Sequence, residues 1–460
     1  MADGVDRANE FVVLDDMAKS SKPCAVPASD KTSVLQSLRA LVGPDEIVEA
    51  GRRLGMIQRD RKLDLPALVE STILAVWPTP GMQTSIFTNY GTLAREMLAP
   101  SSFYDRFSMP YAELMRELMM RAMAAVREAT PPQRRQEDFG VLLKEFTDVQ
   151  VADSTSLLLQ KMARHWAPST SKEKPAGVKW HAIVSLKDGV PFADRLTEQR
   201  LHDSAGLPEG ALASGTLTLF DLGYLDVARF IDAIARGAHF LTRLKTNHNP
   251  VVLRVHTGKG DRVKARGMRL DEALVQKVLL DDGGALDLDV QLEADGKTAK
   301  ARVVAELAPS DGEFHWYLTS VGRDVLSVDD VVEAYRLRWY VELFFKQLKS
   351  GAGLDAIRAT KPSAVAALVF AKVIVLCLAR LLELSIEERE GRHATTQLAL
   401  LLTLTRCAPL LLADSYMRRG ITLAQLEERL LRIASVVARS RNQRRERAKL
   451  KRERGLGHAP

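Results

Sequence analysis

The sequence predicts an α/β fold in which a mixed sheet with flanking helices carries a β-rich insertion and lies between helical terminal regions. Two changes of hydrophobic period support this prediction. Apolar residues recur at helical spacing over 33–127, alternate at strand spacing over much of 146–243, and stay strand-like from 246 to 319. Helical spacing returns at about residue 326. Such an order of elements favours a sheet covered by helices.

The composition is that of a globular, basic chain. Its 460 residues carry a formal net charge of +7 and a pI near 9.2, which favours an anionic partner such as nucleic acid. The excess is concentrated in residues 439–454, which hold nine Arg or Lys against two Glu. This basic tail is either a solvated extension or a segment that reads a nucleic-acid groove, and in both cases it attracts phosphate.

Cysteine usage and hydropathy favour a reducing cytoplasm. Cys24, Cys377 and Cys407 form no CxxC pair, which argues against a disulfide framework or a zinc knuckle. The acidic N-terminus lacks the basic and apolar segments of a signal peptide. The apolar run that begins at Ala364 is interrupted by Lys372, and we interpret it as a core helix.

Two aspartates follow predicted strands. The segment FTDVQVADST alternates and ends on Asp153, and GTLTLFDLGYLD predicts a strand that terminates at Asp221. Between them, VKWHAIVSLKDGVPFADRL predicts a hairpin at Asp188-Gly189. An Asp at a strand end is commonly a turn or cap residue, so these positions alone do not define a site. His202 is left outside it, because a lone histidine is usually structural.

A third acid lies in the segment YRLRWYVELFFKQLKSGAG, which we predict to be one helix. At about 100° per residue, Tyr335, Arg338, Glu342 and Lys349 fall within an arc of roughly 60°. An apolar stripe on the opposite side would dock the helix on a core. The alternative is a solvated charged face in which Glu342 pairs with Lys346, worth only a few tenths of a kcal/mol.

The three acids Asp153, Asp221 and Glu342 form a plausible cluster across a sheet. Carboxylates brought together repel one another unless a cation neutralises them. Oxygen ligands without Cys or His suit Mg²⁺ or Mn²⁺. Two such ions about 3.5–4 Å apart can hold the attacking and leaving oxygens of a phosphodiester in line. This chemistry acts on nucleic acid.

The spacing Tyr335-x2-Arg338-x3-Glu342-x6-Lys349 resembles the Tyr-Arg-Glu-Lys signature of DDE transposases of the insertion-sequence-four family. The neighbouring Trp339 and Phe345 and the run KSGAG strengthen the likeness. VADSTSL around Asp153 looks like the first catalytic aspartate of that family, and FDLGY around Asp221 looks like the second. The resemblance spans roughly residues 147–355 and is thinner in the terminal regions.

This resemblance implies a ribonuclease-H-like catalytic core with a β insertion before the last acid. Asp153, Asp221 and Glu342 would hold two Mg²⁺ or Mn²⁺ ions, cut the ends of an insertion sequence and join the 3′ ends to target DNA without a covalent protein intermediate. The implied partners are the inverted-repeat ends, target DNA and a second copy of the chain in a homodimer. The Leu-rich C-terminal helices could carry the dimer contact or could simply be core.

The resemblance also implies DNA contacts. Tyr335, Arg338 and Lys349 would grip phosphates near the transposon end, and Arg243 in FLTRLK resembles a further basic contact. Trp316 in FHWYLTS stands near the place where hairpin-forming members carry an aromatic that stacks on a flipped base. The alternative for Trp316 is a core tryptophan, so a hairpin intermediate stays open.

The expected domain organisation follows from these assignments. It comprises a flexible arm at 1–30, a helical DNA-binding region at 31–140, the catalytic core at 141–245 and 326–360, the β-rich insertion at 246–325, and a helical C-terminal region with the basic tail at 361–460. Within 31–140, a helix ending before Pro100 and a second one capped by Ser101 are compatible with a helix-turn-helix or with a pair that only packs.

Two other functions are compatible with these residues. A transposase descendant that binds DNA but no longer cuts it would keep the fold, although both aspartates and the complete signature argue against decay of the site. A general nuclease would use the same acids on unrelated DNA. Cleavage restricted to the element's own ends would distinguish the transposase from both.

Overall fold

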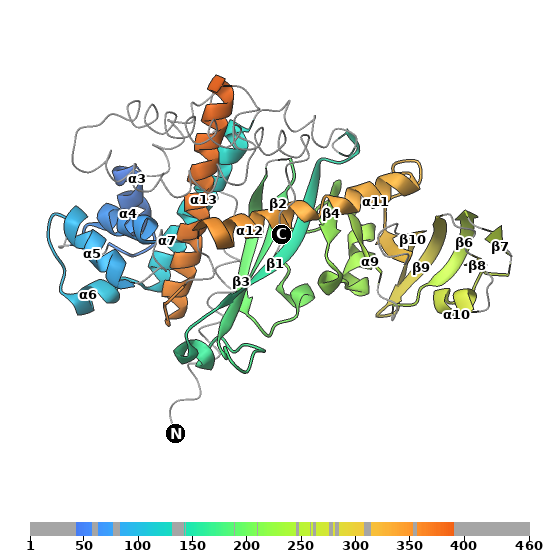
Figure 1. Ribbon diagram of the computed structural model, residues 1–460, viewed down its shortest axis with the longest axis horizontal. Coiled ribbons are helices and arrows are strands. Elements are labelled where there is room, and N and C mark those ends of the chain that lie inside the picture. Colours follow the sequence, from blue (N-terminus) through green and yellow to red (C-terminus); the bar gives the residue numbers. More distant parts are fainter. Residues whose placement is uncertain are drawn as a thin grey trace, which may run out of the picture.

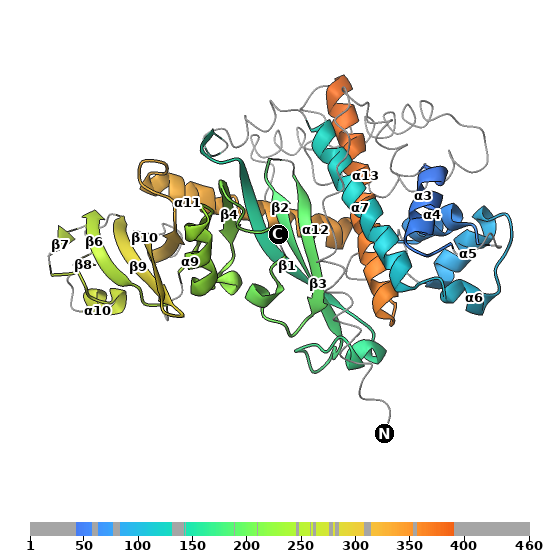
Figure 2. The same ribbon diagram turned by 180° about the vertical axis from the view of Figure 1, so that it is seen from behind.

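The computed structural model describes residues 43–57, 63–76, 83–130, 142, 144–187, 189–208, 210–244, 248–257, 259–260, 264–275, 279–280, 285–307, 314–352 and 357–390. The predicted arm, the Leu-rich segments beyond residue 390 and the basic tail lie outside these described residues. Figures 1 and 2 show a long molecule with a helical part at one end, a sheet in the middle and the β-rich segment at the other end.

A nine-stranded sheet in the order β3-β2-β1-β4-β5-β11-β10-β9-β6 forms the scaffold. Its first half contains β1 (Asp148–Leu158), β2 (Gly177–Ser185), β3 (Val190–Glu198), β4 (Thr216–Phe220) and β5 (His239–Arg243). β1 to β3 are antiparallel, whereas β4 runs parallel to both β1 and β5. The predicted hairpin is confirmed: it joins β2 to β3, and Gly189 there has φ 73°, a value that favours glycine.

The β-rich segment continues this sheet rather than starting a separate one. Its long strands are β6 (Val251–Thr257), β9 (Leu286–Ala294), β10 (Lys297–Leu307) and β11 (Phe314–Thr319). β11 pairs antiparallel with both β5 and β10, so it covers the edge that β5 would otherwise expose. A small two-stranded sheet, β7 (Lys259–Gly260) with β8 (Leu279–Leu280), and helix α10 (Leu270–Val275) accompany it.

Helices cover the two faces of the sheet with different cores. The N-terminal helices are α3 (Pro44–Arg53), α4 (Leu65–Ala75), α5 (Gln83–Leu93), α6 (Pro100–Tyr104) and α7 (Met109–Ala129). α7 packs along α13 (Pro362–Glu390), and both belong to the larger core together with α12 (Trp339–Ala352). The other face packs against α9 (Val227–Ala235). Because side chains alternate along a strand, Val151 joins the first core and Ala152 the second.

Helix α13 confirms the prediction of a core helix. Its segment Pro362–Leu381 is long and apolar enough to cross a membrane, yet 94% of the apolar window is buried inside the protein. Even the Lys372 side chain is fully buried, and its Nζ donates to the Val76 carbonyl at 3.3 Å. The apolar composition therefore serves packing against α4 and α7.

The signature segment is not one helix, as predicted, but two. α11 (Val328–Arg336) ends at a turn over Leu337 and Arg338, and α12 begins at Trp339. At the break, Leu337 N–H donates to Ala334 and Arg338 N–H donates to Tyr335, which is the tight closure typical of a helix end. Figure 1 shows both helices, in orange, across the middle of the molecule.

The predicted helix pair around Pro100 also differs in detail. α6 has only five residues, Ala99 is its N-cap, and Ser101 lies inside the helix rather than capping it. Proline at the first helical position explains this start, because its missing N–H has no partner to lose there. The ring of Tyr104 packs against Phe87 and Phe103. The aromatic side chains of α5 and α6 therefore pack against one another.

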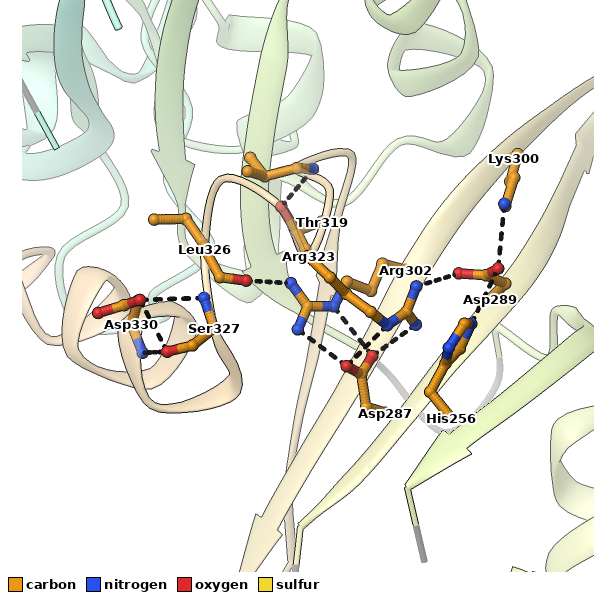
Figure 3. A network of polar contacts seen from close by, with 11 residues as sticks. His256, Asp287, Asp289, Lys300, Arg302, Thr319, Arg323, Leu326, Ser327 and Asp330 are labelled. Carbon is orange, nitrogen blue, oxygen red and sulfur yellow. Dashed lines mark hydrogen bonds and ion pairs between the residues drawn. The ribbon is translucent and has the colours of Figure 1, made fainter. Parts of the chain in front are cut away.

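A charged network connects the β-rich segment to the start of α11 (Figure 3). Asp287 on β9 accepts two hydrogen bonds from Arg302, both 2.9 Å, and two more from Arg323. Arg302 also donates to the Leu326 carbonyl at 2.6 Å. Leu326 immediately precedes Ser327, which caps α11 through a capping box. The network therefore anchors the residue before the N-cap of α11.

Candidate active site

Asp153 and Asp221 lie side by side because their strands are neighbours. β1 and β4 are parallel and pair Ala152 with Phe220, so each aspartate directly follows a residue of that pair. The strand does not end at Asp153 as predicted; β1 continues to Leu158. Asp221 does follow the last residue of β4 and is the N-cap of a 3₁₀ turn. Both side chains take the face that α12 covers.

The three predicted acids converge on one guanidinium, that of Arg338. Its Nη1 lies 3.7 Å from Asp153 Oδ2, and its Nε lies 3.9 Å from Asp221 Oδ1. Its Nη2 forms a close ion pair with Glu342, one helical turn further on. The cation that neutralises Glu342 is thus Arg338, whereas Lys346 is exposed. Three carboxylates share one positive side chain.

The pKa of Asp153 is set mainly by its burial. Burial raises its pKa to about 6, and the charges of Asp221 and Glu342 add to the rise. The Ser154 N–H, which donates to Asp153 Oδ1 at 2.7 Å, and Arg338 oppose it without cancelling it. The Asp153 side chain is 18% exposed, against 46% for Asp221 and 37% for Glu342. All three carboxylates are thus partly accessible to solvent.

The chemistry of these side chains fits a hard divalent ion. All three donors are carboxylates, the ligands that Mg²⁺ and Mn²⁺ prefer. Within the described residues, no group of three or more His, Cys, Asp or Glu side chains is already spaced to hold a metal. Arg338 stands between the acids instead, so a metal would replace its charge in the cluster.

Tyr335 and Lys349 flank the acids in different ways. Tyr335, the penultimate residue of α11, is almost buried, and its ring lies 5.2 Å from that of Tyr317. The Arg338 guanidinium lies 6.0 Å from the Tyr335 ring centroid. Burial raises the pKa of Tyr335 to about 12, so its hydroxyl remains a donor at neutral pH. Lys349 is half-buried in the last turn of α12.

The structure separates Arg243 and Trp316. Arg243 on β5 faces Tyr317 across the strand pair, and its Nη2 is 3.0 Å from His315 Nδ1. Trp316 lies on the opposite face of β11 from Tyr317 and packs against the second core. Trp316 therefore lies on the face opposite the acid cluster and is partly buried, and its base-stacking role stays a prediction.

Comparison with known proteins decides the family. Residues 144–378, just over half of the chain, match the family model described as a transposase DDE domain. The chain belongs to this family of DDE transposases. The match contains Asp153, Asp221 and Glu342.

Insertion-sequence transposases are similar to this DDE transposase. The transposase of IS231F from Bacillus thuringiensis subsp. israelensis is 19% identical over 75% of this chain and 78% of its own length. The probable transposase of IS5377 from Geobacillus stearothermophilus is 22% identical over 76% and 84%. The InsL transposase of IS186A from Escherichia coli is 44% identical over only 17% and 21%. These relatives support a DDE-type transposase of an insertion sequence.

A solved piggyBac transposase synaptic complex with hairpin DNA is also similar to this DDE transposase. It has a TM-score of 0.46 and 9% identity, with 86% of this chain and 84% of that chain covered. At this level of similarity we infer neither fold nor mechanism from it.

Sequence reasoning missed a set of polar side chains directly behind the acids of this DDE transposase. Ser154, the residue after Asp153, points to the opposite face of β1 and donates to Asp203 Oδ1 at 2.8 Å. Lys179 donates to the same oxygen at 2.9 Å. In the sequence, Asp203 is marked only by its position next to His202, and this pair does not indicate a site by itself. Only the folded sheet shows that Asp203 lies next to Ser154 and Lys179.

Proposed function

We propose that this transposase binds the inverted-repeat ends of its insertion sequence, cleaves them and joins the freed 3′ ends to target DNA by a cut-and-paste route. The observation that carries the proposal is the convergence of Asp153, Asp221 and Glu342 on the Arg338 guanidinium. Three carboxylates beside one cation suit a site in which bound metal ions supply the remaining positive charge. Those ions would then act on a phosphodiester.

The metal ligands in this proposal are the three acids. Two Mg²⁺ or Mn²⁺ ions would activate the attacking water or 3′ hydroxyl and stabilise the departing 3′ oxygen. Asp153 and Asp221 hold their positions through the paired strands β1 and β4, and Glu342 through the docking of α12 on the core. Arg338, released from the acids, would donate its planar fork to a phosphate of the bound strand.

The neighbouring cations extend this DNA contact. Lys349 shares the α12 face with Glu342 and would meet the strand next to the cut, and the Tyr335 hydroxyl would donate to the same backbone. Arg243 lies on the same side of the sheet as Tyr335 through its Tyr317 neighbour. A base-stacking role for Trp316 would need DNA to reach the other face, so we do not extend the proposal to a hairpin intermediate.

The finer classification and assembly belong to the same proposal. The order β3-β2-β1-β4-β5, three antiparallel strands followed by parallel neighbours, supports the ribonuclease-H-like core that the insertion-sequence-four resemblance implies. We propose that the helices of 31–140 bind DNA, that 246–325 is the insertion, and that a cytoplasmic homodimer brings two ends together.

The alternative function is a DNA-binding descendant that no longer cuts. An end-nicking assay on the element's own inverted repeats, with and without Mg²⁺, separates the two. Wild-type protein should nick these ends only with Mg²⁺ and leave unrelated DNA intact. Wild-type inactivity on the correct ends would favour the descendant, and equal cleavage of unrelated DNA would favour a general nuclease.

Glu342→Gln is the decisive variant because it removes one charge and keeps the shape of the side chain. We expect nicking to fall by about 10²- to 10³-fold, because a ligand of the metal that stabilises the transition state is lost. End binding in a gel-shift assay should be retained. Lys346→Gln, an exposed change on the same helix, is the matched control and should leave nicking largely intact.

A further inference from the structure

On the face opposite the acid cluster, Asp203 is hydrogen-bonded to the residue after Asp153 and lies close to the turn that follows Asp221. On one side, Ser154 follows Asp153 on β1 and donates to Asp203 Oδ1 at 2.8 Å. Lys179 on the neighbouring strand β2 donates to the same oxygen at 2.9 Å and to the Leu201 carbonyl at 2.9 Å. Asp203 is thus tied to two strands of the sheet.

On the other side, Asp203 closes against the turn that begins at Asp221. A Cβ atom added to Gly223 would lie 3.0 Å from Asp203 Oδ2, so only glycine lets the turn approach this closely without a shift. Tyr224, the next residue, places its hydroxyl 3.0 Å from the Nδ1 of the buried His181. Asp203 therefore hydrogen-bonds the residue that follows Asp153 and lies close against Gly223 in the turn that follows Asp221.

Further contacts hold the segment around Asp203 itself. Arg195 on β3 donates to the Ala205 carbonyl at 2.7 Å, and Arg229 on α9 donates to the Ser204 carbonyl. A Cβ atom added to Gly206 would lie 2.2 Å from the His181 ring. These contacts leave the segment little freedom to move away from the sheet.

The charge of Asp203 is balanced locally. Burial opposes its ionisation, but the hydrogen bonds from Lys179 and Ser154 prevail and lower the pKa of Asp203. A fourth carboxylate can therefore sit behind the acid cluster with its charge matched by Lys179. Asp203 differs in this from Asp153, whose partner Arg338 is shared with two other acids.

We propose that Asp203 is a positioning residue, which sets the separation of Asp153 and Asp221 by hydrogen-bonding Ser154 and packing against Gly223 from the back of the sheet. This proposal rests on the proposed function, because it assumes that the two aspartates bind the metal. Two adjacent carboxylates repel until metal arrives, and a rigid support behind them keeps both oxygens in place. Supporting residues of this kind typically tune metal affinity about 10- to 100-fold.

The test measures Mn²⁺ binding to the full-length protein without DNA, by electron paramagnetic resonance or calorimetry, beside Mn²⁺-dependent nicking. We expect Asp203→Ala to weaken Mn²⁺ binding about 10-fold and to raise the Mn²⁺ concentration for half-maximal nicking in proportion. Asp203→Asn, which keeps an acceptor for Ser154 and Lys179, should recover most of this loss. If Asp203→Ala impairs folding, Ser154→Ala takes its place in the test. Ser154→Ala removes the same hydrogen bond and should also weaken Mn²⁺ binding.

Asp232→Asn is the matched control, since Asp232 forms a similar ion pair with Lys297 at 2.8 Å on the exposed side of α9. It should leave Mn²⁺ affinity unchanged. The proposal is overturned if Asp203→Ala and Ser154→Ala bind Mn²⁺ like wild type, or lose activity equally at every Mn²⁺ concentration. Wild-type protein that neither binds Mn²⁺ nor nicks its ends would overturn the proposed function, and with it this proposal.

Discussion

Two charged clusters of this transposase use the same residue types in opposite proportions. In the network of Figure 3, Asp287 and Asp289 are surrounded by Arg302, Arg323 and Lys300, and every carboxylate finds several donors. In the acid cluster, three carboxylates share Arg338. Among the described residues, the first arrangement is neutralised by the protein itself, whereas the second has negative charge in excess.

The pKa of one aspartate in each cluster is shifted in the opposite direction. Burial opposes the ionisation of Asp289, but hydrogen bonds from Arg323, Lys300 and His256 prevail and hold its pKa far below the usual range. In contrast, Asp153 has its pKa raised to about 6. Carboxylates that are satisfied by fixed partners stabilise a fold, and carboxylates left short of positive charge are available to a ligand. From this comparison we infer that the Asp287 network stabilises the fold and that the acid cluster binds a ligand.

The largest expected effect is on the stability of the satisfied network. Asp287→Ala leaves the buried Arg302 without its carboxylate partner, and breaking a buried ion pair from one side typically lowers the free energy of unfolding by about 3–5 kcal/mol. Urea denaturation followed by circular dichroism measures it. Asp232→Ala, at an exposed pair, should barely move the midpoint. A small effect of Asp287→Ala would remove the contrast between the clusters.

The second prediction concerns Asp153→Asn, which should raise the free energy of unfolding by an amount that depends on pH. The folded pKa of Asp153 lies above its unfolded value of 3.8, so the folded protein binds this proton more tightly and loses stability as pH rises from about 4 to 6. Asp153→Asn should therefore stabilise the metal-free protein at pH 8, by up to roughly 3 kcal/mol. The gain should vanish near pH 4.

Thermal unfolding of both proteins in chelator between pH 4 and pH 8 checks this prediction. The same variant should lose metal-dependent nicking, because a carboxylate ligand is gone. If Asp153→Asn were instead less stable than wild type at pH 8, the acid cluster would be a satisfied network like that of Asp287.

The smallest expected effect concerns the shared cation. Arg338→Ala should weaken binding to inverted-repeat DNA and reduce the slope of log K against log salt by about one, the value for one lost phosphate contact. Fluorescence anisotropy at several salt concentrations measures both quantities. Arg254→Ala, on the distant strand β6, is a control for loss of one positive charge. An unchanged slope would restrict Arg338 to pairing with the acids.

Several parts of the fold and site could be predicted from local pattern. Alternation identified β1, β4 and the hairpin of β2 and β3, because a strand with one face on a core repeats every two residues. The spacing of the signature and the two Asp segments singled out the three acids that the structure brings together. The break at Leu337 was missed, since helix ends depend on closure contacts that apolar spacing does not record.

The sequence by itself determined which side chains could do chemistry, because residue type and helical or strand spacing are local properties. Only the tertiary structure decided that Arg338 sits among the acids, that Trp316 packs on the other face and that Asp203 supports them from behind. These placements depend on strand register and on which face a helix covers. A shift of one residue along β1 or β11 would exchange the two faces, and composition carries no record of that choice.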